Sequence, residues 1–449
     1  MAARVLGCGA QIPGSKVTQT PEIELSIGPA AHGGHCVARH EGRVVFVRHA
    51  LPGEVVKARL TEYDDDARFW RADATDIISA SPDRVNHPWP LADAVLAGLR
   101  GTRPVGGAEF GHIELSAQRR LKAGIFSEQL ARLGTIERSV TVEPVPDEAP
   151  DGLGWRTRVG FAVDPGGHLA MHEHRSTALV PVADMPLAVP SINKLALWET
   201  SFQGVEGVEV AAASGDDEPL VLLRTTGDPA DRHFRALAER IPGASVATWN
   251  PEKGLLQRLR GRTWVREVVG AHSFRVTGEG FWQIHRSAPG VLTDAVLEGL
   301  EPAAGMRVAD LYAGAGLFTA ALAAQVGETG HVLSVEGSPA ASRDARRNLY
   351  GRTQVDIVQG KVERVLRERR PHLDAVVLDP PRAGAGREVV RAITGTGAKV
   401  AVYVSCDPAS FARDAGYFTD AGWDLVSLRV LDLYPHTHHM ESVAVLRPA

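Results

Sequence analysis

The 449-residue sequence contains only three cysteines and has no apolar run that approaches the length of a membrane span. Three cysteines cannot form the disulfide framework of a small secreted protein. The first ten residues also lack the sustained apolar core of a signal peptide. These absences predict a protein of the reducing cytoplasm that does not associate with membranes.

Excess positive charge is also missing. The chain has 49 Lys and Arg against 54 Asp and Glu, for a formal net charge of −5. Overall charge therefore does not support a nucleic-acid partner, and any RNA binding must come from local sites. The length predicts two or three globular domains, because one hydrophobic core rarely organises so many residues.

Residues 17–78 predict a small antiparallel β-barrel of the OB type. Two alternating stretches, 44–47 and 54–60, are separated by a Leu-Pro-Gly turn. Residues 33–38, together with these stretches, resemble a TRAM domain, an RNA-binding barrel. The segment holds seven basic and ten acidic residues, so RNA binding would need one favourable face. The candidates for that face are Arg39, Arg43, Arg48 and Arg71, with Phe46, Phe69 or Trp70 for stacking. A purely structural β-domain is the alternative.

Residues 79–280 predict a connector followed by an α+β central domain. Four prolines interrupt the stretch 79–111, which favours irregular structure. Residues 116–134 have apolar positions at helical spacing, with Ser116 as the candidate N-cap and a glycine at the end. This helix could pack with the C-terminal domain. Residues 156–163 and 220–224 predict strands.

The last part, 281–449, predicts an α/β domain with a Rossmann-like parallel sheet. Residues 308–311 predict a buried strand, 313–316 a glycine turn, 317–326 an apolar helix and 330–336 the next strand. This is a βαβ unit, which is typical of a doubly wound sheet that binds ligands at the carboxyl ends of its strands.

The glycine turn predicts a nucleotide-type cofactor site. Gly314 and Gly316 allow the backbone to approach a ligand closely, and Glu336 ends the next strand, where an acid can accept hydrogen bonds from ribose hydroxyls. With Asp310, this spacing resembles the S-adenosylmethionine site of class I methyltransferases. A dinucleotide site, or a turn that only packs a helix on the sheet, is the alternative.

Two further residues indicate covalent chemistry on a pyrimidine. Carbon 5 of uracil is a poor nucleophile, and addition of a thiolate at carbon 6 activates it. Cys406 ends the predicted strand 400–406 and can supply that thiolate. Glu441 can then remove the proton from carbon 5. The alternative is an inert buried cysteine, which is what we expect of Cys8 and Cys36.

A rigid Asp-Pro-Pro-Arg segment, 379–382, follows the predicted strand 373–378. Amino-methyltransferases usually carry an aromatic residue after the prolines of a related motif, whereas this chain has Arg382. The arginine therefore argues for a different target atom. Close to Glu441, His436, His438 and His439 have spacing that metal ligands can share, but no cysteine or carboxylate cluster accompanies them. We predict no metal there and a hydrogen-bonding role for His439.

Taken together, these motifs resemble the RNA uracil-5-methyltransferase family over essentially the whole chain. The resemblance implies S-adenosylmethionine as methyl donor, RNA as substrate and 5-methyluridine as product. It implies that Cys406 is the nucleophile and Glu441 the proton acceptor. The residues implied to bind the cofactor are Gln283, Tyr312, Gly314, Gly316, Glu336 and Asp379, and those implied to bind the substrate are Phe281, Arg382 and His439.

The chain departs from the family pattern at three places. His285 replaces an asparagine in the motif of Phe281 and Gln283, and Leu317 replaces a polar residue after the glycine turn. Many relatives with a TRAM domain carry iron-sulfur cysteines after the barrel. Residues 84–92 contain no cysteine, and three cysteines cannot supply four ligands when one is catalytic. We predict no iron-sulfur cluster and expect packing around Trp89 to replace it.

The barrel favours ribosomal RNA of the 23S type over transfer RNA, because the transfer RNA branch of the family often lacks it. No obligate protein partner is evident. Two other functions are compatible with the sequence. One is another RNA methyltransferase, such as a cytosine-5 enzyme. The other is a binding or ribosomal RNA assembly factor on a decayed enzyme scaffold.

Overall fold

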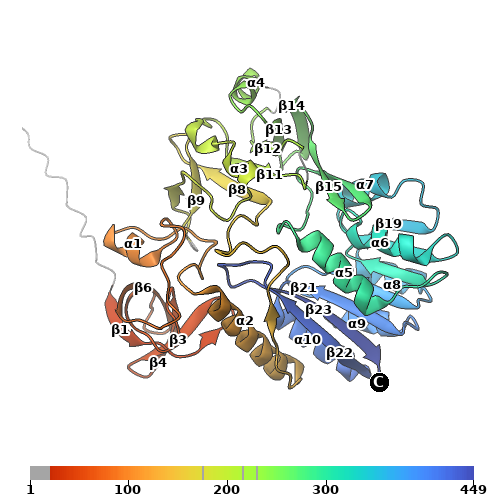
Figure 1. Ribbon diagram of the computed structural model, residues 1–449, viewed down its shortest axis with the longest axis horizontal. Helices are drawn as coiled ribbons and strands as arrows, with labels where there is room; N and C mark the ends of the chain where they lie inside the picture. Colours follow the sequence, from red (N-terminus) through yellow and green to blue (C-terminus); the bar gives the residue numbers. More distant parts are fainter. Residues whose placement is uncertain (1–20, 174–175, 215–216, 229–230) are drawn as a thin grey trace, which may run out of the picture.

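The computed structural model describes residues 21–173, 176–214, 217–228 and 231–449 (Figure 1). Cys8 and the first four residues of the predicted barrel range, 17–20, lie outside the described residues. None of the helices in the described part is long and apolar enough to span a membrane. Three large sheets and one hairpin follow each other along the chain.

The first sheet is a six-stranded barrel with the strand order β1-β5-β6-β4-β3-β2. Inward-facing residues such as Val45, Val47 and Val56 are completely buried. The expected Leu-Pro-Gly turn lies between β4 and β5, but the barrel is not fully antiparallel. β4 pairs with β6 in parallel, because β5 runs against both and lies between them in the chain. The strands are β1 (Glu22–Ser26), β2 (Ala30–Ala31), β3 (His35–His40), β4 (Arg43–Arg48), β5 (Val55–Glu62) and β6 (Phe69–Ser79).

The predicted RNA-binding face of the barrel is partly wrong. Arg48 is buried and pairs with Asp73 at 2.6 Å, so it cannot contact RNA. Arg43 stacks over the ring of Trp70 at 4.6 Å, and Arg71 lies 5.0 Å from the ring of Phe69. The three aromatic residues of this face, with Arg43 and Arg71, lie on β4 and β6, whereas Arg39 lies on β3.

The central sheet has seven strands in the order β10-β9-β8-β11-β12-β13-β14. The predicted strands 156–163 and 220–224 correspond to β8 and β12. Trp89 is 1% exposed in the core of this region, and its indole Nε1 donates to Asp184 at 2.9 Å. The strands are β8 (Arg158–Val163), β9 (Leu169–His172), β10 (Leu179–Pro181), β11 (Gly207–Ala211), β12 (Leu220–Arg224), β13 (Ser245–Asn250) and β14 (Leu255–Arg260); the helices before and within the sheet are α1 (Ala94–Leu99), α3 (Pro190–Asn193) and α4 (Arg232–Glu239).

Helix α2 (Leu115–Gln129) continues as a π-helical turn (Leu130–Gly134) and corresponds to the predicted helix 116–134. Ser116 is not its N-cap. Glu114 takes that position, and its carboxylate accepts the backbone N–H of Ala117 at 3.0 Å. Glutamate is an uncommon cap, which is why the nearby serine was the better candidate by sequence. A hairpin of β15 (Trp264–Val269) and β16 (His272–Thr277) leads into the C-terminal domain.

The C-terminal sheet has eight strands in the order β19-β18-β17-β20-β21-β23-β22-β7. Only β23 runs against its neighbours, so the predicted parallel, doubly wound α/β fold is confirmed. Its strands are β17 (Arg307–Leu311), β18 (His331–Glu336), β19 (Val355–Gln359), β20 (Ala375–Leu378), β21 (Val400–Ser405), β22 (Trp423–Leu431) and β23 (Glu441–Pro448), joined at the edge by β7 (Val142–Glu143). Because β7 comes from the preceding segment, the division at residue 281 stays a prediction.

Helices cover both faces of this sheet (Figure 1). Alternate residues of β20 point to opposite faces: Val377 joins one apolar cluster and Val376 the other. The first cluster includes residues of α5 (Ala288–Leu300), α6 (Leu317–Val326) and α7 (Pro339–Asn348). The second includes residues of α8 (Val362–Arg369), α9 (Gly386–Thr394), α10 (Pro408–Asp420) and α2. This packing fixes the carboxyl ends of the parallel strands at one edge.

Candidate active site

A cavity of about 960 Å³ opens at the carboxyl ends of β17, β18, β20 and β21. Ligands of open α/β sheets bind at this edge. Every predicted site residue except Gly316 lines it. Those residues are Phe281, Gln283, Tyr312, Gly314, Glu336, Asp379, Arg382, Cys406, His439 and Glu441.

The glycine turn is built around Glu336. One carboxylate oxygen of Glu336 accepts the backbone N–H of Gly314 at 2.8 Å, and the other accepts that of Ser338 at 2.5 Å. Gly314 has φ +56°, and Tyr312 has φ +66°, which is costly for a residue with a side chain. Such strain is typical of functional sites, and here the hydrogen bond from Gly314 to Glu336 helps to hold the turn in this conformation.

Gly316 lies away from the cavity. It has φ +93° and begins helix α6, where a Cβ atom would come within 3.0 Å of the side chain of Leu349. The position therefore requires glycine for conformation and packing. Its predicted contact with a cofactor is not supported by this placement.

Asp310 lies on β17, just before the glycine turn. It is completely buried, and its carboxylate accepts a hydrogen bond from the hydroxyl of Thr319 at 2.5 Å. Burial raises the pKa of Asp310 to about 7. Thr319 also contacts Ser334 at 3.0 Å. Sequence reasoning did not find these two partners, which lie on α6 and β18.

Asp379 and Gln283 form the middle of the cavity. The side-chain amide of Gln283 donates to Asp379 Oδ2 at 3.3 Å. Burial and, second, the charge of Asp310 raise the pKa of Asp379 to about 7. A carboxylate held in this way suits a ligand that carries positive charge or hydrogen-bond donors.

Cys406 directly follows β21 and is partly buried in the cavity wall. Burial, then Glu441 and Asp379, raise the pKa of its thiol to about 12, while Arg382 acts in the opposite direction. Cys36 is a bystander as expected: it is buried in the barrel, and its thiol donates to the carbonyl of Ala50 at 3.3 Å.

Glu441 is the first residue of β23 and is 2% exposed. Its Oε2 accepts a hydrogen bond from the hydroxyl of Tyr434 at 3.0 Å. Burial and, second, the charge of Asp379 raise the pKa of Glu441 well above its usual range, and the Tyr434 hydrogen bond opposes this rise. Sequence reasoning did not select Tyr434, although it lies only seven residues before Glu441.

The rim of the cavity combines charge with an exposed aromatic ring. The guanidinium of Arg382 donates to Nε2 of His439 at 3.3 Å. Burial, with His438 and Arg382, lowers the pKa of His439 to about 3, so this imidazole is neutral. Phe281 lies at the mouth with 67% of its surface exposed. An exposed ring of this size is available to stack on a planar ligand.

Three family models match parts of the chain. A model of the TRAM domain matches residues 16–69, and a model of tRNA (uracil-5-)-methyltransferases matches residues 365–448. A model of protein-L-isoaspartate O-methyltransferases matches residues 282–378, which hold the glycine turn.

An RNA methyltransferase of Streptomyces avermitilis, described as uncharacterized, is 44% identical over 95% of this chain and 98% of its own. The chain belongs to the RNA uracil-5-methyltransferase family. A 23S rRNA (uracil(1939)-C(5))-methyltransferase of Methylococcus capsulatus is 31% identical over 94% of this chain and 96% of its own. The enzyme therefore acts on RNA, with S-adenosylmethionine as methyl donor.

A solved structure supports the fold of this methyltransferase. The tRNA (uracil-54, C5)-methyltransferase of Pyrococcus abyssi, in complex with S-adenosyl-L-homocysteine, has a TM-score of 0.69 and 20% identity. The match covers 94% of this chain and 99% of the other. The arrangement of barrel, central sheet and catalytic sheet is thus that of a uracil-5-methyltransferase fold.

The enzyme departs from the family pattern at His285 and Leu317, and both side chains pack against other residues. The ring of His285 stacks on Trp155 at 5.7 Å, and its Nδ1 accepts the backbone N–H of Ser287 at 3.0 Å. Leu317 begins α6 and is buried in the core. Neither substitution brings a new charged group into the cavity.

The loop that carries His436, His438 and His439 is held in place by hydrogen bonds of His436. His436 donates its backbone N–H to Gln118 at 2.8 Å, and its Nε2 lies 2.7 Å from the carbonyl of Asp151. The rings of His438 and His439 lie with their centroids 4.1 Å apart and are tilted by 40° to each other. In the described part of the chain, no group of three or more His, Cys, Asp or Glu is arranged to hold a metal ion.

The barrel touches the segment that carries Cys406. His32, between β2 and β3, lies 3.1 Å from the carboxylate of Asp407. Asp407 directly follows Cys406 and caps α10 by accepting the backbone N–H of Ser410 at 2.7 Å. The hydrogen bond from His32, with that from Ser410, lowers the pKa of Asp407 to about 2 against the opposing effect of burial.

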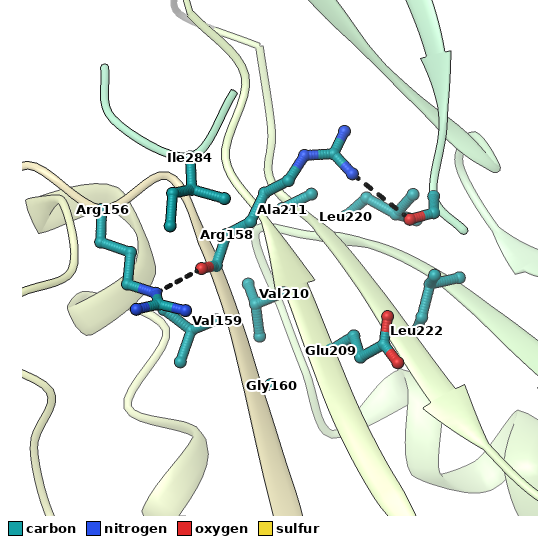
Figure 2. Close-up of a pocket in the computed structure, with 11 residues that line it drawn as sticks. Arg156, Arg158, Val159, Gly160, Glu209, Val210, Ala211, Leu220, Leu222 and Ile284 are labelled. Atoms are coloured by element: carbon teal, nitrogen blue, oxygen red, sulfur yellow. Dashed lines mark hydrogen bonds between the residues drawn. The ribbon is translucent and has the colours of Figure 1, made fainter. Parts of the chain in front are cut away.

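A smaller cavity of about 220 Å³ lies beside the active-site cavity and shares Arg156 and Ile284 with it. Figure 2 shows Arg156 and Arg158 on its wall, with Nε of Arg156 donating to the carbonyl of Arg158 at 2.9 Å. Arg158 donates to the carbonyl of Gly280 at 2.7 Å and so supports the loop before Phe281. Among the described residues, neither guanidinium has a carboxylate at ion-pair distance.

Proposed function

We propose that this enzyme forms 5-methyluridine in 23S ribosomal RNA through a covalent adduct between Cys406 and carbon 6 of the target uracil. The observation that carries the proposal is that Cys406 and Glu441 line one cavity with the residues of the glycine turn. A methyltransferase that acts on nitrogen needs neither a thiolate nor a base of this kind.

Methylation of the uracil would proceed in four steps: addition of the thiolate, methyl transfer, removal of a proton and elimination of the thiolate. The thiolate of Cys406 adds to carbon 6 and forms an enolate whose carbon 5 is nucleophilic. Carbon 5 takes the methyl group of S-adenosylmethionine as the bond between this methyl group and the sulfonium sulfur breaks, and S-adenosylhomocysteine is left as the second product. Glu441 then removes the proton from carbon 5, the double bond returns, and the thiolate of Cys406 leaves carbon 6. The enzyme regains its thiol when Glu441 gives up this proton.

The chain offers suitable groups for the cofactor. Glu336 lies at the end of β18, where its carboxylate can accept hydrogen bonds from ribose hydroxyls, and Gly314 leaves open space beside the backbone. Asp379, held by Gln283, suits the positively charged part of the ligand. Tyr312 would cover one side of the cofactor. This set fits S-adenosylmethionine, so the methyl donor would lie between the glycine turn and Cys406.

For the RNA, we propose contacts at the cavity mouth and on the barrel. The exposed ring of Phe281 would stack on a base, and Arg382 with His439 would hydrogen-bond the target. Arg156, which has no carboxylate partner among the described residues, would take a phosphate near the target. Ribosomal RNA is favoured by the barrel and by the 23S RNA specificity in the name of the Methylococcus relative.

The deciding experiment measures methyl transfer from labelled S-adenosylmethionine to unmodified total RNA by the wild type and by Cys406→Ala. We expect label in 23S RNA, recovered as 5-methyluridine, and none with Cys406→Ala. Label recovered as 5-methylcytidine would show that the target base is cytosine and not uracil. RNA binding without any methyl transfer would overturn the enzymatic proposal and favour a binding factor.

A further inference from the structure

The loop between β22 and β23, residues 432–440, is held by helix α2. The side chain of Lys122 is completely buried, and its ammonium donates to Asp432 at 2.6 Å. The same ammonium donates to the backbone carbonyl of Tyr434 at 3.1 Å. The hydroxyl of Thr437 donates to this carbonyl as well, at 2.9 Å. The backbone of Tyr434 is therefore fixed from two sides.

The side chain of Tyr434 is also fixed. Its ring meets Trp155 edge to face at 5.9 Å and His439 at 6.1 Å. The hydroxyl donates to Glu441 Oε2 at 3.0 Å. No group among the described residues donates a hydrogen bond to the other oxygen, Oε1. One carboxylate oxygen is thus restrained, and the second is left for the ligand in the cavity that both residues line.

We propose that Tyr434 is a positioning residue for the proton-accepting step: its hydroxyl holds Oε2 of Glu441, so that Oε1 takes the proton from carbon 5 of the methylated adduct. The inference rests on the proposed role of Glu441 as base. It goes further by assigning the orientation of the base to one hydroxyl group on a loop that α2 fixes in place.

Charge provides a second reason for this hydrogen bond. Glu441 accepts a proton only as a carboxylate, whereas burial and Asp379 favour its protonated form. The groups that face this region are Asp379 and Cys406 beside Glu441, Arg382 beside Cys406, and His439 beside Tyr434. Among the residues that act on Glu441, Tyr434 favours the carboxylate. Loss of its hydroxyl would raise the pKa of Glu441 further.

Tyr434→Phe tests the inference, because it removes the hydroxyl and keeps the ring. In a single turnover on ordinary RNA, we expect release of the covalent adduct to slow about tenfold, as for loss of one hydrogen bond to a charged group. The acidic limb of the release rate should also move to higher pH, because the base would be protonated over a wider range. Both are followed by the fraction of enzyme crosslinked to RNA on denaturing gels.

RNA containing 5-fluorouridine separates this step from the earlier ones. Fluorine on carbon 5 cannot leave as a proton, so the adduct accumulates without need of the base. The wild type and Tyr434→Phe should trap this RNA at equal rates. If the wild type traps none, the proposed function itself fails, and the inference fails with it. If only Tyr434→Phe fails to trap it, Tyr434 serves binding or the nucleophile, which overturns the positioning role.

Tyr403→Phe is the matched control. Tyr403 is a completely buried phenol on β21, and its hydroxyl donates to Asp414 at 2.8 Å. It lies outside the residues that line the cavity. We expect Tyr403→Phe to release the adduct at the wild-type rate and with the wild-type pH profile. Release by Tyr434→Phe that matches the wild type in rate and pH profile would overturn the inference.

Discussion

The raised pKa of Cys406 means that its thiol ionises only if a nearby group stabilises the thiolate. Burial, Glu441 and Asp379 all oppose ionisation of its thiol, and among the main influences only Arg382 favours it. Arg382 is exposed at the rim and contacts His439, which is neutral. The guanidinium charge is therefore available to stabilise a negative charge that forms on sulfur.

Arg382→Gln should make Cys406 less reactive. With iodoacetamide at pH 8, we expect alkylation of Cys406 to slow by about three- to tenfold, because loss of a nearby positive charge raises the pKa of the thiol by about half a unit to one unit. Peptide mass spectrometry distinguishes Cys406 from the other two cysteines.

The matched control is Arg387→Gln, five residues along the same segment. Arg387 is exposed and lies over the ring of Tyr417 at 4.2 Å, outside the cavity. It should leave the alkylation rate unchanged. Equal rates for Arg382→Gln and Arg387→Gln would show that Arg382 does not assist the thiolate.

The hairpin β15–β16 carries a buried acid that serves no catalytic step. Glu267 is 2% exposed, and its Oε1 has no hydrogen-bond partner in the described part of the protein. Burial raises its pKa from 4.5 to about 7. A raised pKa means that folding favours the protonated acid. The stabilising contribution is complete below pH 4.5 and is lost as the pH rises toward 7.

Glu267→Gln should stabilise the enzyme at pH 8 by about 1–3 kcal/mol and change little at pH 4.5, where the glutamic acid is already neutral. Thermal unfolding of both proteins at the two pH values measures this difference. An equal effect at both pH values would indicate a packing change instead of a titration. Glu239→Gln, on the exposed surface of α4, should have no effect at either pH.

At the level of the whole molecule, α2 joins the N-terminal half to the catalytic sheet. It packs against α10, contacts β2 of the barrel, and holds the loop 432–440 through Lys122. The ammonium of Lys122 and the carboxylate of Asp432 are both completely buried. Removing one partner of such a pair leaves an uncompensated charge in the interior.

Lys122→Met should lower the free energy of unfolding by about 3 kcal/mol, because Asp432 would keep only Arg119 as an ionic partner among the described residues. Amide hydrogen exchange in residues 432–441 should become faster, and methyl transfer should fall with it. Lys57→Met, which breaks the exposed pair with Asp76, should change stability by less than about 1 kcal/mol. Unchanged exchange in Lys122→Met would mean that α2 does not fix this loop.

The elements that the sequence predicted best are those set by local pattern. The apolar run 317–326 became α6, and the short apolar run 220–223, followed by Arg224, became β12. The predicted N-cap of α2, Ser116, was wrong. The carboxylate of Glu114 accepts the backbone N–H of Ala117 instead, and residue preferences do not include this geometry. The prediction that Arg48 contacts RNA was wrong because its partner, Asp73, lies on a strand that is brought beside it only when the barrel folds.

The glycine turn and Cys406 each lie at the end of a predicted strand, and Glu441 lies where the chain enters the final strand. These local signals were enough for the sequence alone to determine the class of fold and the proposed chemistry. Parallel strands place their ends at one edge, so local signals were enough to predict a shared site. Tertiary structure decided what surrounds that site. Lys122 reaches Asp432 across 310 residues of chain, and Trp155 reaches Tyr434 in the same way. Such contacts depend on how whole sheets pack, which no local pattern specifies.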